Sequence, residues 1–390
     1  MELLGLFVTA SMPVLKVLLL TGLGSYLALD SVNILGKDAI KYLNTIVFYV
    51  FNPALVGSSL ANTVTYDSMI KLWFMPVNVL ITFIIGSLLG WIVIHFTRPP
   101  QHLRGLILGC CAAGNLGNLP LIIIPALCKE KGSPFGDSDV CYSYGMAYVS
   151  LSMAIGAIYL WSYVYNIVRV SSTSINDIKS SRESLEEPLL LPSPEDVALQ
   201  VGDSESSGIK QLRLVKLFRE LNLKALLAPS TIGAIIGYII GVVPLFRKSL
   251  IGSGAPLRVI QDSAVLLGDG AIPALTLIIG GNLLRGLRGE GIQKSLVVGI
   301  VVARYIALPL TGILVVKGAV HLGLVQQEPL YQFVLLLQFV VPPAMNIGTM
   351  TQLFGAGEKE CSVIMFWTYA LASISLTIWC TYFMWLVTTS

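Results

Sequence analysis

Apolar residues fill long stretches of this chain, and charged residues are concentrated between them. A membrane-spanning helix needs about 20 mainly apolar residues, and ten stretches meet this requirement. They cover residues 5–29, 39–61, 70–96, 104–127, 141–169, 225–246, 257–283, 292–317, 329–354 and 360–387. The first is longer than the apolar core of a signal peptide and lacks a basic segment before it, so we expect it to be a retained span. The pattern predicts an all-α polytopic membrane protein with ten transmembrane helices.

Composition supports this assignment. Of the 390 residues, 55% are hydrophobic and only 12% are charged, which is too little charge to cover a water-exposed surface. No basic tract with interleaved aromatic residues suggests nucleic-acid binding. The three histidines are scattered, and the six cysteines lie in or beside apolar stretches without CxxC spacing. We therefore expect no metal, no cofactor and no disulfide framework.

The middle of the chain, residues 171–224, differs from the rest. It is rich in Ser, Glu, Pro and Lys, and such a segment cannot bury enough apolar surface to offset its ordering entropy. Its end, from Lys210 to Lys224, is basic and amphipathic, which suits a membrane surface. We predict a mostly disordered loop that separates five spans in residues 1–170 from five spans in residues 225–390.

Lysine and arginine positions predict the orientation, because cytoplasmic loops carry an excess of them. With the central loop in the cytosol, its side also holds Lys37, Lys41, Arg98, Arg104, Arg169, Arg285, Arg288, Lys294 and Lys359. The opposite side holds Lys71, Lys129, Lys131, Arg247, Lys248, Arg258 and Lys317. Both termini are then expected on the side away from the cytosol.

The two halves share an internal register. Asn52-Pro53-Ala54-Leu55 in the second stretch matches Ile272-Pro273-Ala274-Leu275 in the seventh at an offset of 220, and an asparagine follows each proline by nine residues. Proline-containing breaks in the fourth and ninth stretches nearly keep this offset. Two halves of five spans each must insert with opposite orientation, so we predict an inverted repeat, a frequent plan of secondary transporters.

The breaks are the main candidate site. One reads Gly-Asn-Leu-Gly-Asn-Leu-Pro over residues 114–120, and the other reads Val-Pro-Pro-Ala-Met-Asn-Ile-Gly over 341–348. Proline removes a backbone hydrogen bond, and freed backbone groups within a bilayer are tolerated only inside protein or beside a water-filled cavity. Half-helix N-termini attract anions. The predicted ligand-binding residues are Asn52, Pro53, Asn115, Asn118, Leu119, Pro120, Tyr144, Tyr148, Gln338, Pro342, Pro343 and Asn346.

Charges inside spans are costly and commonly functional. Lys16 is predicted either to reach the interface or to attract an anion, and Asp269 lies four residues before Pro273, where it can reach a cavity. For Arg304 we expect either a transport role or a structural pair with Asp269. No carboxylate pair occurs at the breaks, so the sequence does not indicate a dedicated sodium or proton site. An amide-rich, charge-poor site suits a small amphipathic weak acid.

Three other functions are compatible with parts of the sequence. Gly268-Asp269 and Pro273-Ala274-Leu275 match fragments of intramembrane aspartyl proteases, but Leu266 interrupts the glycine motif, so the chain is not expected to be an enzyme. A membrane ligand sensor that does not transport would use the same fold. A carrier of another organic anion, coupled to sodium or protons, is a further alternative.

The Asn52-Pro53-Ala54-Leu55 stretch, both breaks and the five-loop-five layout resemble the plant PIN-LIKES proteins of the auxin efflux carrier superfamily. The resemblance covers nearly the whole chain apart from the central loop. It implies an auxin transport facilitator of the endoplasmic reticulum membrane that moves auxin from cytosol to lumen and so controls auxin signalling. It also implies the crossover fold of sodium/proton antiporters and bile-acid transporters, with crossing broken helices 4 and 9, homodimeric assembly and an auxin carboxylate near the prolines of the breaks.

Overall fold

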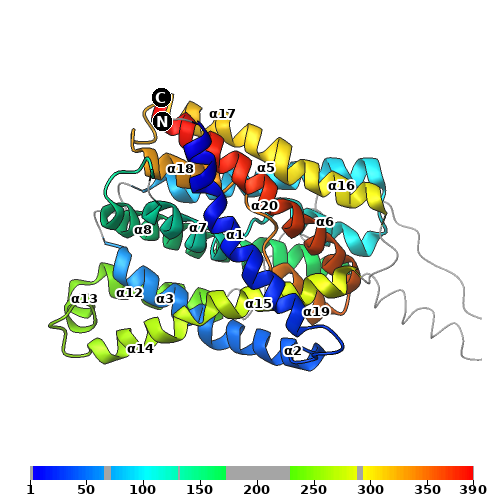
Figure 1. Cartoon of the computed structure of the whole chain (residues 1–390), viewed down its shortest axis with the longest axis horizontal. Coiled ribbons are helices and arrows are strands. Elements are labelled where there is room, and N and C mark those ends of the chain that lie inside the picture. The colour runs from blue at the N-terminus through cyan, green and yellow to red at the C-terminus, as the bar shows by residue number, and fades with distance from the viewer. Residues whose placement is uncertain (1–2, 66–71, 131, 173–228, 288–292, 390) are drawn as a thin grey trace, which may run out of the picture.

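Helices make up the folded part of this chain. The computed structural model describes residues 3–65, 72–130, 132–172, 229–287 and 293–389, and Figure 1 shows the arrangement of its elements. With η denoting a π-helix, the elements are α1 (Leu3–Leu27), α2 (Lys37–Ile46), η1 (Val47–Phe51), α3 (Asn52–Thr63), α5 (Phe74–Thr97), α6 (Gln101–Ala112), α7 (Asn118–Lys129), α8 (Ser138–Tyr159), η2 (Leu160–Val164), α12 (Pro229–Val242), α13 (Pro244–Leu250), α14 (Arg258–Asp269), α15 (Ala271–Leu287), α16 (Lys294–Val302), η3 (Ala303–Ala307), α17 (Leu308–His321), α18 (Pro329–Leu337), α19 (Asn346–Phe354) and α20 (Glu358–Thr389). The predicted all-α class is confirmed for these residues.

Six helical segments of the described residues are long and apolar enough to cross a membrane. They are Lys37–Asn62, Phe74–Thr97, Ser138–Ser172, Arg258–Leu283, Lys294–His321 and Glu358–Thr389. A seventh arises if α12 and α13, which bend by 98° at their junction, count as one broken span. The chain is thus a multi-pass membrane protein, whereas ten spans and an inverted repeat stay predictions. The predicted loop over residues 171–224 lies outside the described residues from position 173 onward.

The helices pack in two groups. In the first, α1 lies against α15, and α3 lies against α12 and α14. In the second, α5 packs on α6, α7 on α8, and α18 and α19 on α20. Contacts of α1 and α15 with α20, and of α3 with α8, join the two groups. The start of α1 and the end of α20 lie at the same end of the bundle (Figure 1).

Small residues permit the closest helix contact in the first group. On α12, Gly233, Gly237 and Gly241 recur every four residues and therefore share one face. That face packs on α3, where a Cβ added at Gly233 would lie 2.5 Å from the carbonyl oxygen of Pro53. Glycine spacing of this kind brings helix backbones close together in membranes, where van der Waals packing drives association.

Two π-turns precede prolines inside long spans. The π-helix η1 is followed directly by Asn52-Pro53, and η3 is followed by Leu308-Pro309. Proline lacks the N–H that would complete an α-helical hydrogen bond, and a widened turn accommodates the loss without ending the span. The Asn52-Pro53 pair therefore modifies the helical turn of its span and does not interrupt it.

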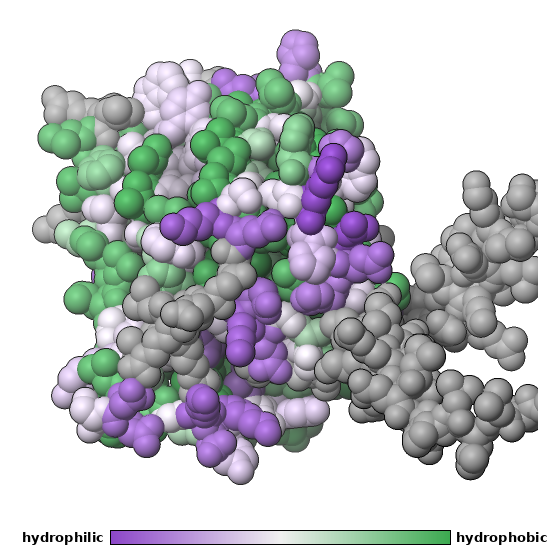
Figure 2. All heavy atoms as spheres, turned by 90° about the vertical axis from the view of Figure 1, so that its right-hand side faces the viewer, coloured by the Kyte–Doolittle hydropathy of each residue, from purple (hydrophilic) through white to green (hydrophobic). Residues whose placement is uncertain are grey.

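The end of the bundle at the right of Figure 1 is exposed to the viewer in Figure 2. Hydrophilic residues gather across the middle and lower part of this end, and hydrophobic residues cover much of the adjoining flank (Figure 2). Exposed large apolar side chains are also numerous along the helices, among them Leu19, Phe96, Val259, Leu266 and Leu314. This distribution fits a bundle whose flanks face lipid and whose ends face water.

Candidate functional site

Helical structure is interrupted at both positions where the sequence predicts a break. The helix α6 ends at Ala112 and α7 begins at Asn118, whereas α18 ends at Leu337 and α19 begins at Asn346. Glycine and proline account for the interruptions, because they weaken or remove the hydrogen bonds that continue a helix. Each interruption leaves backbone groups that need partners inside the protein.

The two interrupted segments supply those partners to each other. An isolated antiparallel bridge joins Gly114 to Pro343. The N–H of Asn115 donates to the carbonyl oxygen of Pro342 at 2.8 Å, and the N–H of Ala344 donates back to the first segment at 2.9 Å. The two segments, more than 200 residues apart in sequence, therefore meet in the interior.

The side chain of Asn115 ties this junction to α20. Its amide donates to the hydroxyl of Tyr369 at 3.0 Å, and that hydroxyl donates to the carbonyl oxygen of Pro343 at 2.9 Å. Its amide oxygen accepts from the N–H of Asn118 at 3.2 Å, at the start of α7. Asn115 is 5% exposed, so its hydrogen-bonding groups serve the protein itself.

Arg304 connects the C-terminal end of α6 to the second unwound segment. Its guanidinium donates to the carbonyl oxygen of Cys111 at 3.1 Å, to that of Val341 at 2.5 Å and to that of Pro342 at 3.1 Å. The side chain is 1% exposed. The alternative that Arg304 pairs with Asp269 is wrong, because the guanidinium bonds carbonyl oxygens of α6 and of the second unwound segment, and the ion pairs among the described residues do not include it.

Gln338 belongs to a second buried network just before the other break. Asn78 of α5 donates to its amide oxygen at 2.8 Å and to the carbonyl oxygen of Leu335 at 3.1 Å. The amide of Gln338 donates in turn to the hydroxyl of Ser152 on α8 at 3.0 Å. With 2% of Gln338 exposed, the structure places this predicted ligand contact within the packing between α5, α8 and α18.

The side-chain amides of two predicted break residues, Asn118 and Asn346, do not take part in these networks. The side chains of Asn118 and Asn346 stand at the first positions of α7 and α19. Both are partly exposed, and neither amide has a hydrogen-bond partner among the described residues. The other predicted residues of the breaks are buried, namely Leu119, Pro120, Pro342 and Pro343. Asn52 is also buried, at the start of α3. Pro53 is partly exposed.

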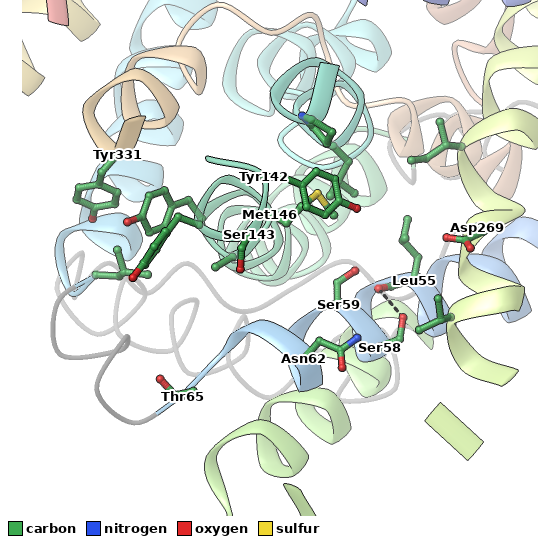
Figure 3. A pocket seen from close by; sticks show the side chains of 18 of the residues that line it. Leu55, Ser58, Ser59, Asn62, Thr65, Tyr142, Ser143, Met146, Asp269 and Tyr331 are labelled. Carbon is green, nitrogen blue, oxygen red and sulfur yellow. Dashed lines mark hydrogen bonds between the residues drawn. The ribbon is translucent and has the colours of Figure 1, made fainter. Parts of the chain in front are cut away.

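A cavity of about 1010 Å³ reaches Leu121 on α7, and the residues of the two breaks are not among those that line it. Polar side chains of α3 form one wall, and side chains of α8 form the opposite wall, as Figure 3 shows for Ser58, Ser59 and Asn62 facing Tyr142 and Ser143. Leu121, about one helical turn after Asn118 on α7, and Leu55, about one turn after Asn52 on α3, also line the cavity. The polar residues of α3 in this wall were not among the predicted site residues, although Ser58 and Asn62 are four residues apart and therefore share one face of the helix. Thr65 follows the end of α3 and also lines the cavity.

Tyr144 and Tyr148 line this cavity, as does an acid that sequence analysis did not single out. The hydroxyl of Tyr148 lies 2.8 Å from both carboxylate oxygens of Glu328. The ring of Tyr331 packs against Tyr148 with centroids 5.1 Å apart. The cavity wall therefore combines aromatic surface with one anchored carboxylate.

The predicted intramembrane charges have different surroundings. Lys16 pairs with Glu130 at 3.7 Å, and its side chain is 60% exposed, so the exposed position favours the interface over a buried anion site. Asp269 lines the cavity and points into it in Figure 3. Among the described residues, no group of three or more His, Cys, Asp and Glu side chains is placed to hold a metal ion.

A disulfide corrects one expectation from the sequence. Cys128 and Cys141 are bonded, with Cα atoms 5.5 Å apart, whereas the other four cysteines are free and buried. No local pattern indicates the bond, because the two half-cystines lie near the ends of separate helices, α7 and α8, and come together when those helices pack. Neighbouring Lys129 and Tyr142 line the cavity, so the disulfide closes the loop at its rim.

Comparisons with known proteins agree with this architecture. A family model described as membrane transport protein matches residues 9–380. The chain is 63% identical over 387 residues to Protein PIN-LIKES 1 of Arabidopsis thaliana, covering 99% of this chain and 81% of that protein. It is 62% identical over 390 residues to Protein PIN-LIKES 3 of the same plant, covering 99% of each. Protein PIN-LIKES 6 is 33% identical over 400 residues, covering 96% of this chain and 92% of that protein.

Proposed function

This chain belongs to the membrane transport protein family, within its PIN-LIKES group, and we propose that it is a secondary carrier of auxin. The substrate would be indole-3-acetic acid or a similar weak acid, moved from cytosol to lumen across the endoplasmic reticulum membrane, and this flux would control intracellular auxin signalling. Membership of the family makes the chain a transporter rather than an enzyme. The choice of auxin and of the endoplasmic reticulum rests on the family resemblance.

The observation that carries the proposal is the pair of unpartnered amides at the junction. Asn118 and Asn346 begin the second halves of two interrupted helices whose unwound segments are hydrogen-bonded to each other. Helix N-termini present free N–H groups and the positive end of the helix dipole. A carboxylate placed between them would exchange its hydration for amide hydrogen bonds.

The adjacent cavity supplies the rest of a carrier site. Its volume of about 1010 Å³ is at the upper end of the range, on the order of 300–1,000 Å³, that small-molecule sites occupy. The aromatic rings of Tyr142, Tyr144 and Tyr148 offer flat apolar surface for an indole ring. The polar side chains of α3 would allow water to hydrate the anion as it enters the cavity.

The proposal includes an elevator-type motion between the two groups of helices. In this proposal the interrupted helices form the moving part, and the group containing α1, α3, α12 and α15 forms the scaffold and the face of a homodimer. The cavity separates α3 of the scaffold from α7 and α8 of the moving part. Sliding between these groups would carry the junction from one side of the membrane to the other.

The disulfide supports the proposed orientation. Disulfides persist in oxidising compartments such as the lumen of the endoplasmic reticulum. Cys128 and Cys141 flank the loop that the lysine and arginine distribution predicts to be on the lumenal side. With this loop in the lumen, both termini are lumenal and the central loop is cytosolic.

Uptake of labelled indole-3-acetic acid into proteoliposomes tests the proposal. Wild-type protein should support saturable uptake, and Asn118→Ala and Asn346→Ala should each reduce it about tenfold or more, since a hydrogen bond to a charged ligand contributes about 1.5–3 kcal/mol. Asn166→Ala is a matched control, because the amide of Asn166 bonds only within its own helix, to Ser162. Unchanged uptake in both test variants would remove the proposed site.

Two alternatives give different results in the same assay. An ion-coupled carrier of another organic anion would ignore indole-3-acetic acid and need a sodium or proton gradient. A membrane ligand sensor would bind the acid without flux, and deletion of residues 171–220 would abolish its signalling.

A further inference from the structure

Arg304 is a buried cation whose hydrogen bonds go to backbone carbonyl oxygens. The three acceptors belong to Cys111, at the end of α6, and to Val341 and Pro342, in the second unwound segment. The two ion pairs found among the described residues join other side chains, Lys16 to Glu130 and Arg258 to Asp262. No carboxylate in the described part of the chain lies within salt-bridge distance of the guanidinium.

A buried charge without a counter-ion is expensive, so the carbonyl oxygens must stabilise it. Carbonyl oxygens freed by unwinding carry partial negative charge, and in carriers with interrupted helices such oxygens and helix C-terminal ends coordinate a coupling sodium ion. Cys111 supplies a helix C-terminal end, and Val341 and Pro342 supply unwound carbonyls. The guanidinium therefore has the kind of ligands that a monovalent cation would have.

We propose that Arg304 acts as a tethered cation that takes the place of a coupling ion at the junction. It neutralises the carbonyl oxygens at the C-terminal end of α6 and in the second unwound segment, which would otherwise repel a carboxylate, and it leaves the junction with a net positive charge. Substrate flux is then selective for anions and independent of sodium and potassium. The inference rests on the proposed function for its substrate and goes beyond it in assigning ion selectivity to one positioning residue.

The local geometry favours a guanidinium over an ammonium group. Its planar fork donates along several fixed directions, which lets one side chain bond carbonyls 230 residues apart in sequence, at Cys111 and Val341. Gly114 provides the space, because a Cβ there would lie 2.5 Å from the Nη2 atom of Arg304. Pro342 also accepts from the N–H of Asn115, so the cation is one hydrogen bond away from the segment that carries the candidate site.

The first test measures ion dependence in the intact carrier. Proteoliposomes containing wild-type protein are assayed for labelled indole-3-acetic acid uptake with sodium, potassium or choline as the only monovalent cation at equal ionic strength. Equal initial rates are expected. Sodium-dependent uptake would overturn the inference while leaving the proposed function intact, and absence of uptake in all three salts would overturn the proposed function.

The second test removes the tethered cation. Arg304→Ala should lower uptake roughly 10- to 100-fold, and millimolar guanidinium should restore part of it, whereas choline should not. Arg304→Lys should keep the charge but lose the fork and show intermediate uptake. Lys317→Ala is the control, since this exposed lysine lies on α17 of the same span and its loss should leave uptake unchanged.

A substrate-free measurement keeps the inference testable if the variant transports nothing. The thermal midpoint of purified wild-type protein in detergent should be the same in sodium and choline. For Arg304→Ala it should be lower in choline and rise when sodium or guanidinium is added. A purely structural arginine would give a lower midpoint that no cation restores, and that outcome would contradict the tethered-cation role.

Discussion

Gly114 lies directly against the guanidinium of Arg304, and a Cβ built on this glycine would lie 2.5 Å from the Nη2 atom. A second obstacle is the side chain of Val341, at 2.7 Å. Neither neighbour can yield easily, because Arg304 and Val341 are both almost fully buried. Gly114 in the first break therefore leaves the space that the guanidinium of Arg304 needs in order to bond the second break.

Gly114→Ala should consequently displace Arg304. We expect a loss of stability of about 1–3 kcal/mol from overpacking and a loss of uptake similar to that of Arg304→Ala. Gly318→Ala is the matched control, because nothing lies within 4 Å of a Cβ at this position. Thermal midpoints and initial uptake rates of both variants check the prediction, which a wild-type rate in Gly114→Ala would contradict.

Tyr369→Phe should loosen the junction without changing its shape. The lost hydroxyl accepts from Asn115 and donates to the carbonyl oxygen of Pro343, so two buried groups lose a partner at a cost of about 1–3 kcal/mol. Tyr382→Phe, at a tyrosine that is 38% exposed, should be nearly neutral. The thermal midpoint in detergent distinguishes the two, and equal midpoints would show that the Tyr369 hydroxyl is not needed.

Substitutions at Gln338 should affect folding more than substrate affinity. Gln338→Leu removes one of the two acceptors of the Asn78 amide, which keeps the carbonyl oxygen of Leu335, and it removes the amide that donates to the Ser152 hydroxyl. Loss of these buried hydrogen bonds costs about 1–3 kcal/mol. Adding Asn78→Leu should recover part of that loss, since both partners are then apolar. We expect a lower thermal midpoint with an unchanged KM for uptake. A raised KM at wild-type stability would instead make Gln338 a ligand contact.

The disulfide predicts a specific thiol count. Protein denatured without reductant should react with maleimide at four cysteines and, after reduction, at six. Cys128→Ser with Cys141→Ser should then lower stability by roughly 3 kcal/mol, because the bond closes a short loop in the unfolded chain. Six reactive thiols before reduction would show that the bond is absent and would remove its support for a lumenal loop.

Local sequence features predict the apolar helices and the two interruptions of the candidate site, but the 98° bend between α12 and α13 was not predicted. Hydropathy depends on residue type, and the interruptions at 113–117 and 338–345 follow from glycine and proline, which act on the backbone within one helical turn. The candidate residues Asn118 and Asn346 were identified because they adjoin these interruptions. The same reasoning could not separate them from Asn115 and Gln338, whose amides are used within the protein.

The membrane class, the all-helical structure and the two breaks depend on composition or on neighbouring residues, so they can be predicted from the order of amino acids. The hydrogen-bond and disulfide partners depend on how the helices pack. Arg304 donates hydrogen bonds to Cys111, 193 residues earlier, and to Val341, 37 residues later. Cys128 is bonded to Cys141, and the polar side chains of α3 face the aromatic side chains of α8 across the cavity. Such pairings are set by helix packing, in which most buried polar groups are hydrogen-bonded, and no local pattern specifies the partner.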